Sequence, residues 1–320
     1  MILDILLLLA LPASGKSELR RYLETLDPAQ ARDDLHLGPT IQIDDYPYVH
    51  MMRRIAAEVR AAGEDPIFFA SSEEPFLEPG DWATLMHLLN ADFADLSEPP
   101  ESPAAGSAAT WLFARIDAAR VASGLSSAIS ELGPMTQKRL RSALETEART
   151  VFDEKLAAIP TNLEGHTIVM EFARGGPEGS LLPLPHPYGY QHSLAQLDDT
   201  ILERAAILYV WVEPEDSRRK NRERAEPGPD GDASILHHGV PEAVMRNDYG
   251  TDDLMWMLAA GGGSAIVVEK DDRRFAIPTG VFDNRDDYTS FLRADEADWS
   301  PFQLRQLHRE LINATAGLRA

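Results

Sequence analysis

The sequence of 320 residues contains no cysteine, and this absence excludes several kinds of chemistry. Disulfide bridges, thiolate nucleophiles and cysteine-ligated zinc all need a residue that the chain does not have. A membrane-spanning run is missing as well, since it needs about 20 consecutive apolar residues. Asp4 stands where a secretory signal peptide carries Lys or Arg. We therefore expect a cytoplasmic protein without a membrane partner.

Positive charge is also scarce, because 30 Lys and Arg residues face 52 Asp and Glu residues, for a net charge of −22. Such a surface repels the phosphate backbone of nucleic acids, so we expect no nucleic-acid partner. Lysine is the rarer cation and occurs only at positions 16, 138, 155, 220 and 270. A hydrophobic content of 44% is typical of a globular chain, and its length allows a large core.

The N-terminal apolar run, from Ile5 to Leu11, leads directly into Ser-Gly-Lys-Ser at positions 14–17. This order predicts a buried strand, a phosphate-binding loop and a helix whose positive end faces the bound anion. The usual pattern, G-x-x-x-x-G-K-[ST], begins with glycine where this chain has Ala10, so we expect ordinary backbone angles at that position. The alternative is an unrelated turn before a helix.

The loop pattern predicts a binding site for ATP and Mg²⁺. Backbone N–H groups of the loop surround the phosphate oxygens, the lysine reaches the β- and γ-phosphates, and the serine after it is a ligand of Mg²⁺. The residues that we assign to this site are Pro12, Ala13, Ser14, Gly15, Lys16 and Ser17.

Continuous apolar runs predict further strands, because strands that are covered on both faces have few polar residues. These runs lie at 40–43, 167–172 and 206–212, with a weaker one at 66–70 and a hairpin or strand pair at 265–269 and 275–282. Apolar residues at helical spacing predict helices over 16–26, 48–62, 80–96, 194–201 and 301–314, and a polar helix follows Pro214. The alternation of strands and helices indicates a three-layer α/β fold with a parallel core sheet.

We expect one domain over residues 1–320, with two additions. A helical insertion spans about 80–160 and contains a linker at 97–107 that is rich in Pro, Glu and Ala. An arginine-bearing lid spans about 214–248, and the Pro and Gly residues at 225–233 predict a hinge within it.

Asp44 and Asp45 follow the second predicted strand. The ligand crevice of a parallel sheet lies beyond the carboxyl ends of its strands, so these acids are expected to face the bound phosphates. One of them would accept the proton of a substrate hydroxyl or hold that hydroxyl in line with the γ-phosphate. The alternative is an Asx turn or a helix N-cap before Tyr46.

Glu171 lies near the end of the third strand and is the second acidic candidate. Beside a phosphate loop, such an acid orients the water shell of Mg²⁺ or its Ser17 ligand. The alternative is a strand-end acid that is paired with an arginine such as Arg174. Arg174 in turn contacts either a substrate anion or a structural carboxylate.

The polar helix after Pro214 carries Arg218, Arg219 and Arg222. Two of these lie one turn apart, so we expect a single stripe of guanidinium groups that binds phosphate oxygens and stabilises the charge of the transition state. A solvent-exposed charged helix is the alternative.

These motifs together resemble the P-loop kinases of the nucleoside and nucleotide kinase type, over the segments 1–70 and 160–285. The resemblance implies a five-stranded parallel core in the order 2-3-1-4-5, Mg·ATP as donor and a small hydroxyl-bearing acceptor. It also places Asn284 near the adenine base, where a simple turn is the alternative. Two features depart from it: Phe172 follows Glu171 where nucleoside kinases often have glycine, and the stretch 80–160 has no counterpart.

The sequence therefore predicts an ATP- and Mg²⁺-dependent kinase that acts on a hydroxyl of a small metabolite such as a nucleoside or a sugar derivative. The catalytic candidates are Lys16, Asp44, Asp45, Arg218 and Arg222; Arg219 and Glu171 join the loop in binding the nucleotide, and Ser17 and Glu171 hold the metal. The alternative function is a regulatory NTPase whose helical insertion binds a partner protein. Two pairs of histidines are not assigned to the site. For His237 and His238 we expect a lid or cap role rather than a metal site, and for His186 and His192 we expect packing in the core or a loop rather than a place in the acceptor pocket.

Overall fold

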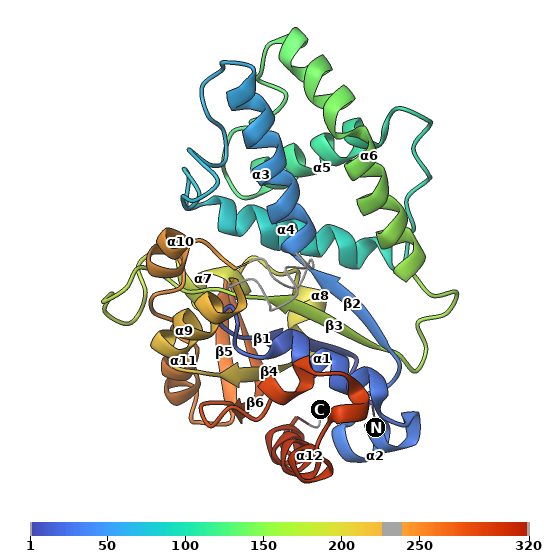
Figure 1. Ribbon diagram of the computed structural model, residues 1–320, viewed down its shortest axis with the longest axis vertical. Helices are drawn as coiled ribbons and strands as arrows, with labels where there is room; N and C mark the ends of the chain where they lie inside the picture. The colour runs from blue at the N-terminus through green and yellow to red at the C-terminus, as the bar shows by residue number, and fades with distance from the viewer. Residues whose placement is uncertain (1, 226–238, 319–320) are drawn as a thin grey trace.

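The computed structural model describes residues 2–225 and 239–318 (Figure 1). Within these residues, six strands form one sheet in the order β2-β3-β1-β4-β6-β5. All neighbouring strands are parallel except β5 and β6, which are antiparallel. The strands are β1 (Ile5–Leu9), β2 (Thr40–Asp44), β3 (Thr167–Phe172), β4 (Ala205–Trp211), β5 (Ala265–Lys270) and β6 (Arg273–Asp283).

The expected α/β class is confirmed, and the predicted strands at 40–43, 167–172 and 206–212 all form. The sheet differs from a purely parallel five-stranded core, because the chain adds β5 at one edge as a hairpin with β6. Asp271 and Asp272 form the two-residue turn of this hairpin, and Asp271 takes a positive φ of 52°. Aspartate tolerates that left-handed conformation better than most residues do.

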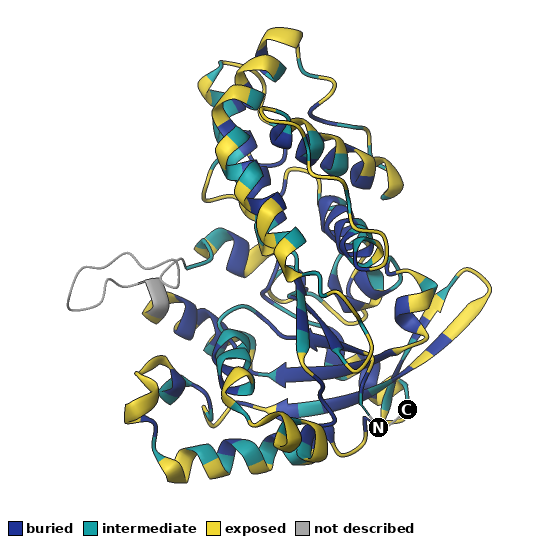
Figure 2. Ribbon diagram, turned by 90° about the vertical axis from the view of Figure 1, so that its right-hand side faces the viewer, coloured by how far each residue is buried: buried dark blue, intermediate teal, exposed yellow. Residues whose placement is uncertain are grey.

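Helices cover both faces of the sheet and make three layers (Figure 1). One face packs against α1 (Lys16–Thr25), α2 (Pro28–Leu35) and α12 (Pro301–Thr315). The other face packs against α7 (Gly189–Leu194), α8 (Asp199–Leu202) and α11 (Leu254–Ala260). The central strand β1 is buried along its whole length, in agreement with its continuous apolar sequence (Figure 2).

A helical lobe rises from the carboxyl end of β2 (Figure 1). It consists of α3 (Tyr46–Ala61), α4 (Asp81–Asp95), α5 (Ala108–Ala122) and α6 (Pro134–Ala158), which share one hydrophobic cluster. The inner faces of these helices are buried, whereas their outer faces are exposed (Figure 2). The helical region therefore begins at α3, before the boundary near residue 80 that the sequence suggested.

The remaining elements lie beside the carboxyl edge of the sheet or lead into α12. They are α9 (Pro214–Ala225), α10 (Glu242–Asn247) and two short 3-10 helices, η2 (Ser290–Arg293) and η3 (Glu296–Asp298). The predicted hinge at 225–233 lies largely outside the described residues, and His237–His238 lie wholly outside them. In the part of the chain that is described, no helix has both the length and the apolar character that a bilayer crossing requires.

Two predictions of secondary structure were wrong, and some helices were not predicted. Among the latter is α2: Pro28 occupies its first turn, and the Asp27 carboxylate caps its N-terminus, 2.9 Å from the N–H of Ala29. Residues 66–70 form only an isolated bridge between Phe69 and Phe76. The single helix expected at 194–201 is split into α7 and α8, and α10 and α11 had no predicted counterpart.

Candidate functional site

The loop between β1 and α1 has the backbone that a phosphate cradle requires. Gly15 precedes α1 with a φ of 104°, a backbone conformation that residues other than glycine rarely adopt. Ala13 also lies in the left-handed region, with φ of 54°, which for alanine stores backbone strain. Ala10 is absent from the positive-φ positions of the described residues, in agreement with the expectation of ordinary angles there.

The N-terminus of α1 is available to an anion. No side chain within the described residues caps it, so its first N–H groups and its dipole face the loop. The Ser14 hydroxyl is buried and has no hydrogen-bond partner among the described atoms. A buried polar group without a partner is rare in proteins, and an absent ligand is one of its ordinary explanations. The loop therefore fits a phosphate group.

Lys16 is nearly buried, and its ammonium group lies 3.7 Å from the Glu171 carboxylate. Burial lowers the pKa of Lys16, while Glu171 and the two aspartates after β2 oppose that shift. Glu171 also pairs with Arg20 on α1, at 3.5 Å. The arginine partner that we considered, Arg174, is therefore the wrong one. A carboxylate paired with the loop lysine holds that lysine at the carboxyl edge of the sheet.

The register of the sheet explains why these charges meet. Glu171 is paired in the sheet with Leu8 on one side and with Asp44 on the other. Ile43 and Phe172 point to the face covered by α7, so their neighbours Asp44 and Glu171 point to the α1 face, where Lys16 lies. The two acids thus flank the same cation from adjacent strand ends.

Asp44 and Asp45 have different surroundings. One Asp44 oxygen accepts a hydrogen bond from the N–H of Tyr46 at 2.7 Å, which is the Asx turn that we considered as an alternative. Burial, followed by the charges of Glu171 and Asp45, raises the pKa of Asp44 to about 6. Asp45 instead forms a 2.7 Å ion pair with Arg174. Asp44 is therefore the acid that can change protonation near neutral pH.

Arg174 is a structural centre of the site. Its side chain is only 2% exposed, and its guanidinium group lies over the rings of Trp82 and Phe172 at 4.9 and 5.2 Å. Among the described atoms its Nε has no partner. Trp82 lies in the first turn of α4, so Arg174 ties the end of β3 to the helical lobe as well as to Asp45. Of the two roles considered for Arg174, the structural ion pair with a carboxylate is the one that agrees with its contact to Asp45.

The three arginines of α9 do not form a free stripe. Arg219 points to Asp216 and Glu223 of its own helix and is half exposed. Arg218 is buried against Glu178 at 2.9 Å, and one of its terminal nitrogens has no partner among the described atoms.

Arg222 pairs with Glu242 at 3.6 Å, and Arg246 bridges Glu242 and Glu178 at 2.9 and 2.7 Å. Arg218 and Arg222 therefore belong to one network, which joins α9 to α10 and to the segment after β3. Among the described residues this network contains three arginines and two carboxylates.

The sequence did not single out Ser217 and Lys220, whereas the simple turn considered for Asn284 agrees with the contacts of that residue. Ser217 donates a 2.7 Å hydrogen bond to the carbonyl of Pro12 in the loop. Asn284 is fully buried, and its amide group bonds the carbonyl of Ser14, so the contacts of Asn284 are those of a structural turn. Lys220 is buried against Asp287 at 2.9 Å. These contacts join residues far apart in the chain, so no local pattern signals them.

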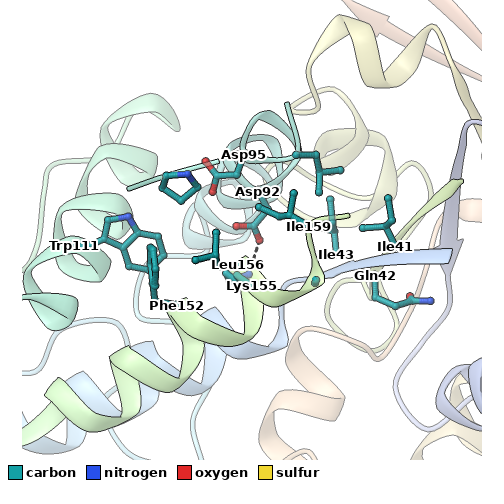
Figure 3. A pocket seen from close by; sticks show the side chains of 13 residues that line it. Ile41, Gln42, Ile43, Asp92, Asp95, Trp111, Phe152, Lys155, Leu156 and Ile159 are labelled. Atoms are coloured by element: carbon teal, nitrogen blue, oxygen red, sulfur yellow. Dashed lines mark hydrogen bonds and ion pairs between the residues drawn. The ribbon is translucent and has the colours of Figure 1, made fainter. Parts of the chain in front are cut away.

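Two other candidate regions are structural. A cavity of about 40 Å³ lies between β2 and the helical lobe, and Asp92 and Lys155 form a 2.6 Å ion pair in its wall (Figure 3). Asp92 also accepts a hydrogen bond from Tyr48, so the charges of this wall pair with one another. The rings of His186, which is exposed, and His192 lie edge to face with their centroids 4.2 Å apart, a contact that agrees with loop packing.

The described residues contain no group of three or more His, Asp or Glu side chains that is arranged to hold a metal ion. Mg²⁺ in nucleotide sites needs fewer protein ligands, because water and phosphate oxygens complete its shell. Ser17 and Glu171 offer a hydroxyl and a carboxylate beside the loop, which are suitable donors. Comparisons of the chain with protein-family models, curated proteins and solved structures found no match.

Proposed function

We propose that this protein is an ATP- and Mg²⁺-dependent phosphotransferase that acts on a hydroxyl of a small metabolite. The proposal depends on one observation above all: Lys16, at the uncapped start of α1, pairs with Glu171, whose neighbour across the sheet is Asp44. A lysine, free helix N–H groups and two acids at the carboxyl edge of a parallel sheet are the parts that phosphoryl transfer needs.

The donor side consists of the loop residues 12–17. The N–H groups of the loop and of the first turn of α1 bind phosphate oxygens, and the Ser14 hydroxyl supplies one further donor. Lys16 binds the β- and γ-phosphates in exchange for its contact with Glu171. Ser17 and Glu171 would hold Mg²⁺, which would neutralise charge on the phosphates.

The acceptor side is built around Asp44. A pKa of about 6 leaves its carboxylate ionised at neutral pH, yet basic enough to take the proton of an attacking hydroxyl. Asp45 acts through Arg174, which fixes the turn after β2 relative to β3 and to the helical lobe. The lobe covers the same edge of the sheet, so it forms the wall against which the acceptor binds.

The arginines of α9 complete the site. Arg218 follows Ser217, which touches the loop, and its unpartnered nitrogen is a ready donor for a phosphate oxygen. An arginine in this position stabilises the negative charge that develops during transfer. Arg219 and Arg222 lie on the same helix and add to its positive field.

The sheet supports the same conclusion. Numbered among themselves, the parallel strands β2, β3, β1, β4 and β6 follow the order 2-3-1-4-5, and β5 is an added edge strand. The loop follows the central strand of this series, and its neighbours on either side, β3 and β4, lead into Arg174 and α9.

The proposal is tested by a transfer assay with [γ-³²P]ATP, Mg²⁺ and a panel of nucleosides, sugars and amino alcohols, with Asp44→Asn as the inactive control. We expect one class of acceptor to become labelled and the label to depend on Lys16 and Asp44. ATP turnover that no acceptor changes, but that a protein partner increases, would instead support the regulatory NTPase. Binding of ATP without any turnover would indicate a non-catalytic nucleotide module.

A further inference from the structure

The phosphate loop is held from outside by two side chains that come from other parts of the chain. Ser217, in the first turn of α9, donates its hydroxyl proton to the carbonyl of Pro12 at 2.7 Å. Asn284, directly after β6, donates its amide proton to the carbonyl of Ser14, also at 2.7 Å. Both side chains are fully buried, so neither competes with solvent for these bonds.

These two bonds fix the direction of two N–H groups. In a planar trans peptide the C=O and the N–H point in opposite directions. The carbonyl of Pro12 shares its peptide plane with the N–H of Ala13, and the carbonyl of Ser14 shares its plane with the N–H of Gly15. When Ser217 and Asn284 draw the carbonyls outward, the N–H groups of Ala13 and Gly15 turn to the opposite side, away from both side chains.

Asn284 is itself held rigidly. Its side-chain oxygen accepts the N–H of Tyr288 at 2.7 Å, its amide nitrogen also lies 2.8 Å from the hydroxyl of Thr289, and its own N–H is bonded to the carbonyl of Trp211. The turn that follows is closed by Lys220 of α9, which reaches Asp287 at 2.9 Å. Ser217 and Lys220 therefore connect the same helix to both the loop and the turn that supports it.

The fit between this turn and the loop is close. A Cβ atom added to Gly15 would lie 2.2 Å from the hydroxyl oxygen of Thr289 and 2.8 Å from the amide nitrogen of Asn284. Contacts this short are not tolerated, so the loop can reach Asn284 only because position 15 is glycine. The positive φ of Gly15 and its missing side chain thus serve the same contact.

We propose that Ser217 and Asn284 are positioning residues of the phosphate site, which hold the N–H groups of Ala13 and Gly15 toward the phosphate oxygens of the bound nucleotide. This inference rests on the proposed function, since it assigns a role within the same loop. It also links α9 to the loop: the helix that carries Arg218 orients the donors on which the nucleotide binds.

The test compares Asn284→Ala with Asn90→Ala. Asn90 makes the same pair of buried contacts elsewhere: its amide donates to the carbonyl of Gln196 at 2.8 Å, and its oxygen accepts the N–H of Asp198 at 3.0 Å. Both substitutions remove two hydrogen bonds to the backbone and are expected to lower the melting temperature to a similar extent. The affinity for Mg·ATP, measured by titration calorimetry, separates them.

We expect Asn284→Ala to raise the Kd for Mg·ATP about two- to tenfold, because the N–H of Gly15 loses its direction, and Asn90→Ala to leave it unchanged. Ser217→Ala should raise the Kd about two- to tenfold, as expected for one lost hydrogen bond, and Ser217→Thr, which keeps the hydroxyl, should restore binding.

An unchanged Kd in Asn284→Ala, with the same loss of stability as in Asn90→Ala, would overturn the inference and leave the proposed function intact. If Asn284→Ala does not fold, an unchanged Kd in Ser217→Ala overturns it equally. If the unaltered protein binds no Mg·ATP, the proposed function fails first, and the inference fails with it.

Discussion

Asp44 and Asp45 are neighbours in the chain, yet replacing each by asparagine is expected to change stability in opposite directions. Burial raises the pKa of Asp44 from an ordinary 3.8 to about 6 in the folded protein. The folded chain therefore keeps this proton to higher pH than the unfolded chain does, and the site loses stability as the pH rises from about 4 to about 6. An asparagine side chain cannot ionise, so Asp44→Asn removes this cost.

The size of the effect follows from the pKa difference. About two pKa units correspond to about 3 kcal/mol, so Asp44→Asn is expected to add about 2–3 kcal/mol to the free energy of unfolding at pH 8, but only about 1 kcal/mol at pH 4.5. Asp45→Asn removes the charge that neutralises the buried Arg174 guanidinium and should cost about 3 kcal/mol.

Urea unfolding, followed by circular dichroism between pH 4.5 and pH 8, measures both effects. Asp44→Asn should also abolish the transfer activity. A substitution that stabilises the fold but destroys activity is typical of a functional site. The reasoning is refuted if Asp44→Asn lowers stability at pH 8, or if its gain does not grow with pH. A stable Asp45→Asn variant would show that the Arg174 pair does not hold the turn.

Three further substitutions test other parts of the account. Glu178→Gln frees Arg218 from its carboxylate and should lower the Kd for Mg·ATP about two- to tenfold in calorimetry; weaker binding would contradict the role given to that arginine. Burial raises the pKa of Asp248 to about 7, so Asp248→Asn should gain about 2–4 kcal/mol of stability in urea at pH 8 and clearly less at pH 5, whereas a pH-independent effect would be contrary to this pKa. Gly15→Ala should lower the melting temperature far more than Gly63→Ala: both positions have positive φ, but the structure describes no atom within 4 Å of a Cβ at Gly63, so equal losses would show that the close contacts at Gly15 are unimportant.

Local patterns predicted the parts of the fold that local physics determines. Buried parallel strands are continuous apolar runs, so β1, β3 and β4 were visible in the sequence. The acid after β2 was expected at the carboxyl edge because parallel strands bring their ends together. The helix α2 was missed although a signal existed: an aspartate directly before a proline, as at Asp27 and Pro28, is typical of a helix start.

The remaining features depend on contacts that no local pattern contains. Arg174 meets Asp45 across 129 residues, and Asn284 meets Ser14 across 270. The break between α7 and α8 is similar, since its backbone groups are satisfied by Asn90 from α4 rather than by a nearby capping residue. Tertiary packing likewise decides that Asp45 pairs with Arg174, whereas Glu171 pairs with Lys16 and Arg20.

Titration calorimetry with Mg·ATP decides whether residues 12–17 bind the phosphates of a nucleotide. Lys16→Ala is compared with Lys138→Ala, which removes an exposed lysine of α6. The unaltered protein and Lys138→Ala should bind alike, while Lys16→Ala should bind at least about tenfold more weakly, as expected for the loss of a charged hydrogen-bond donor. Binding that Lys16→Ala leaves unchanged, or no binding to the unaltered protein, would contradict phosphate binding by residues 12–17.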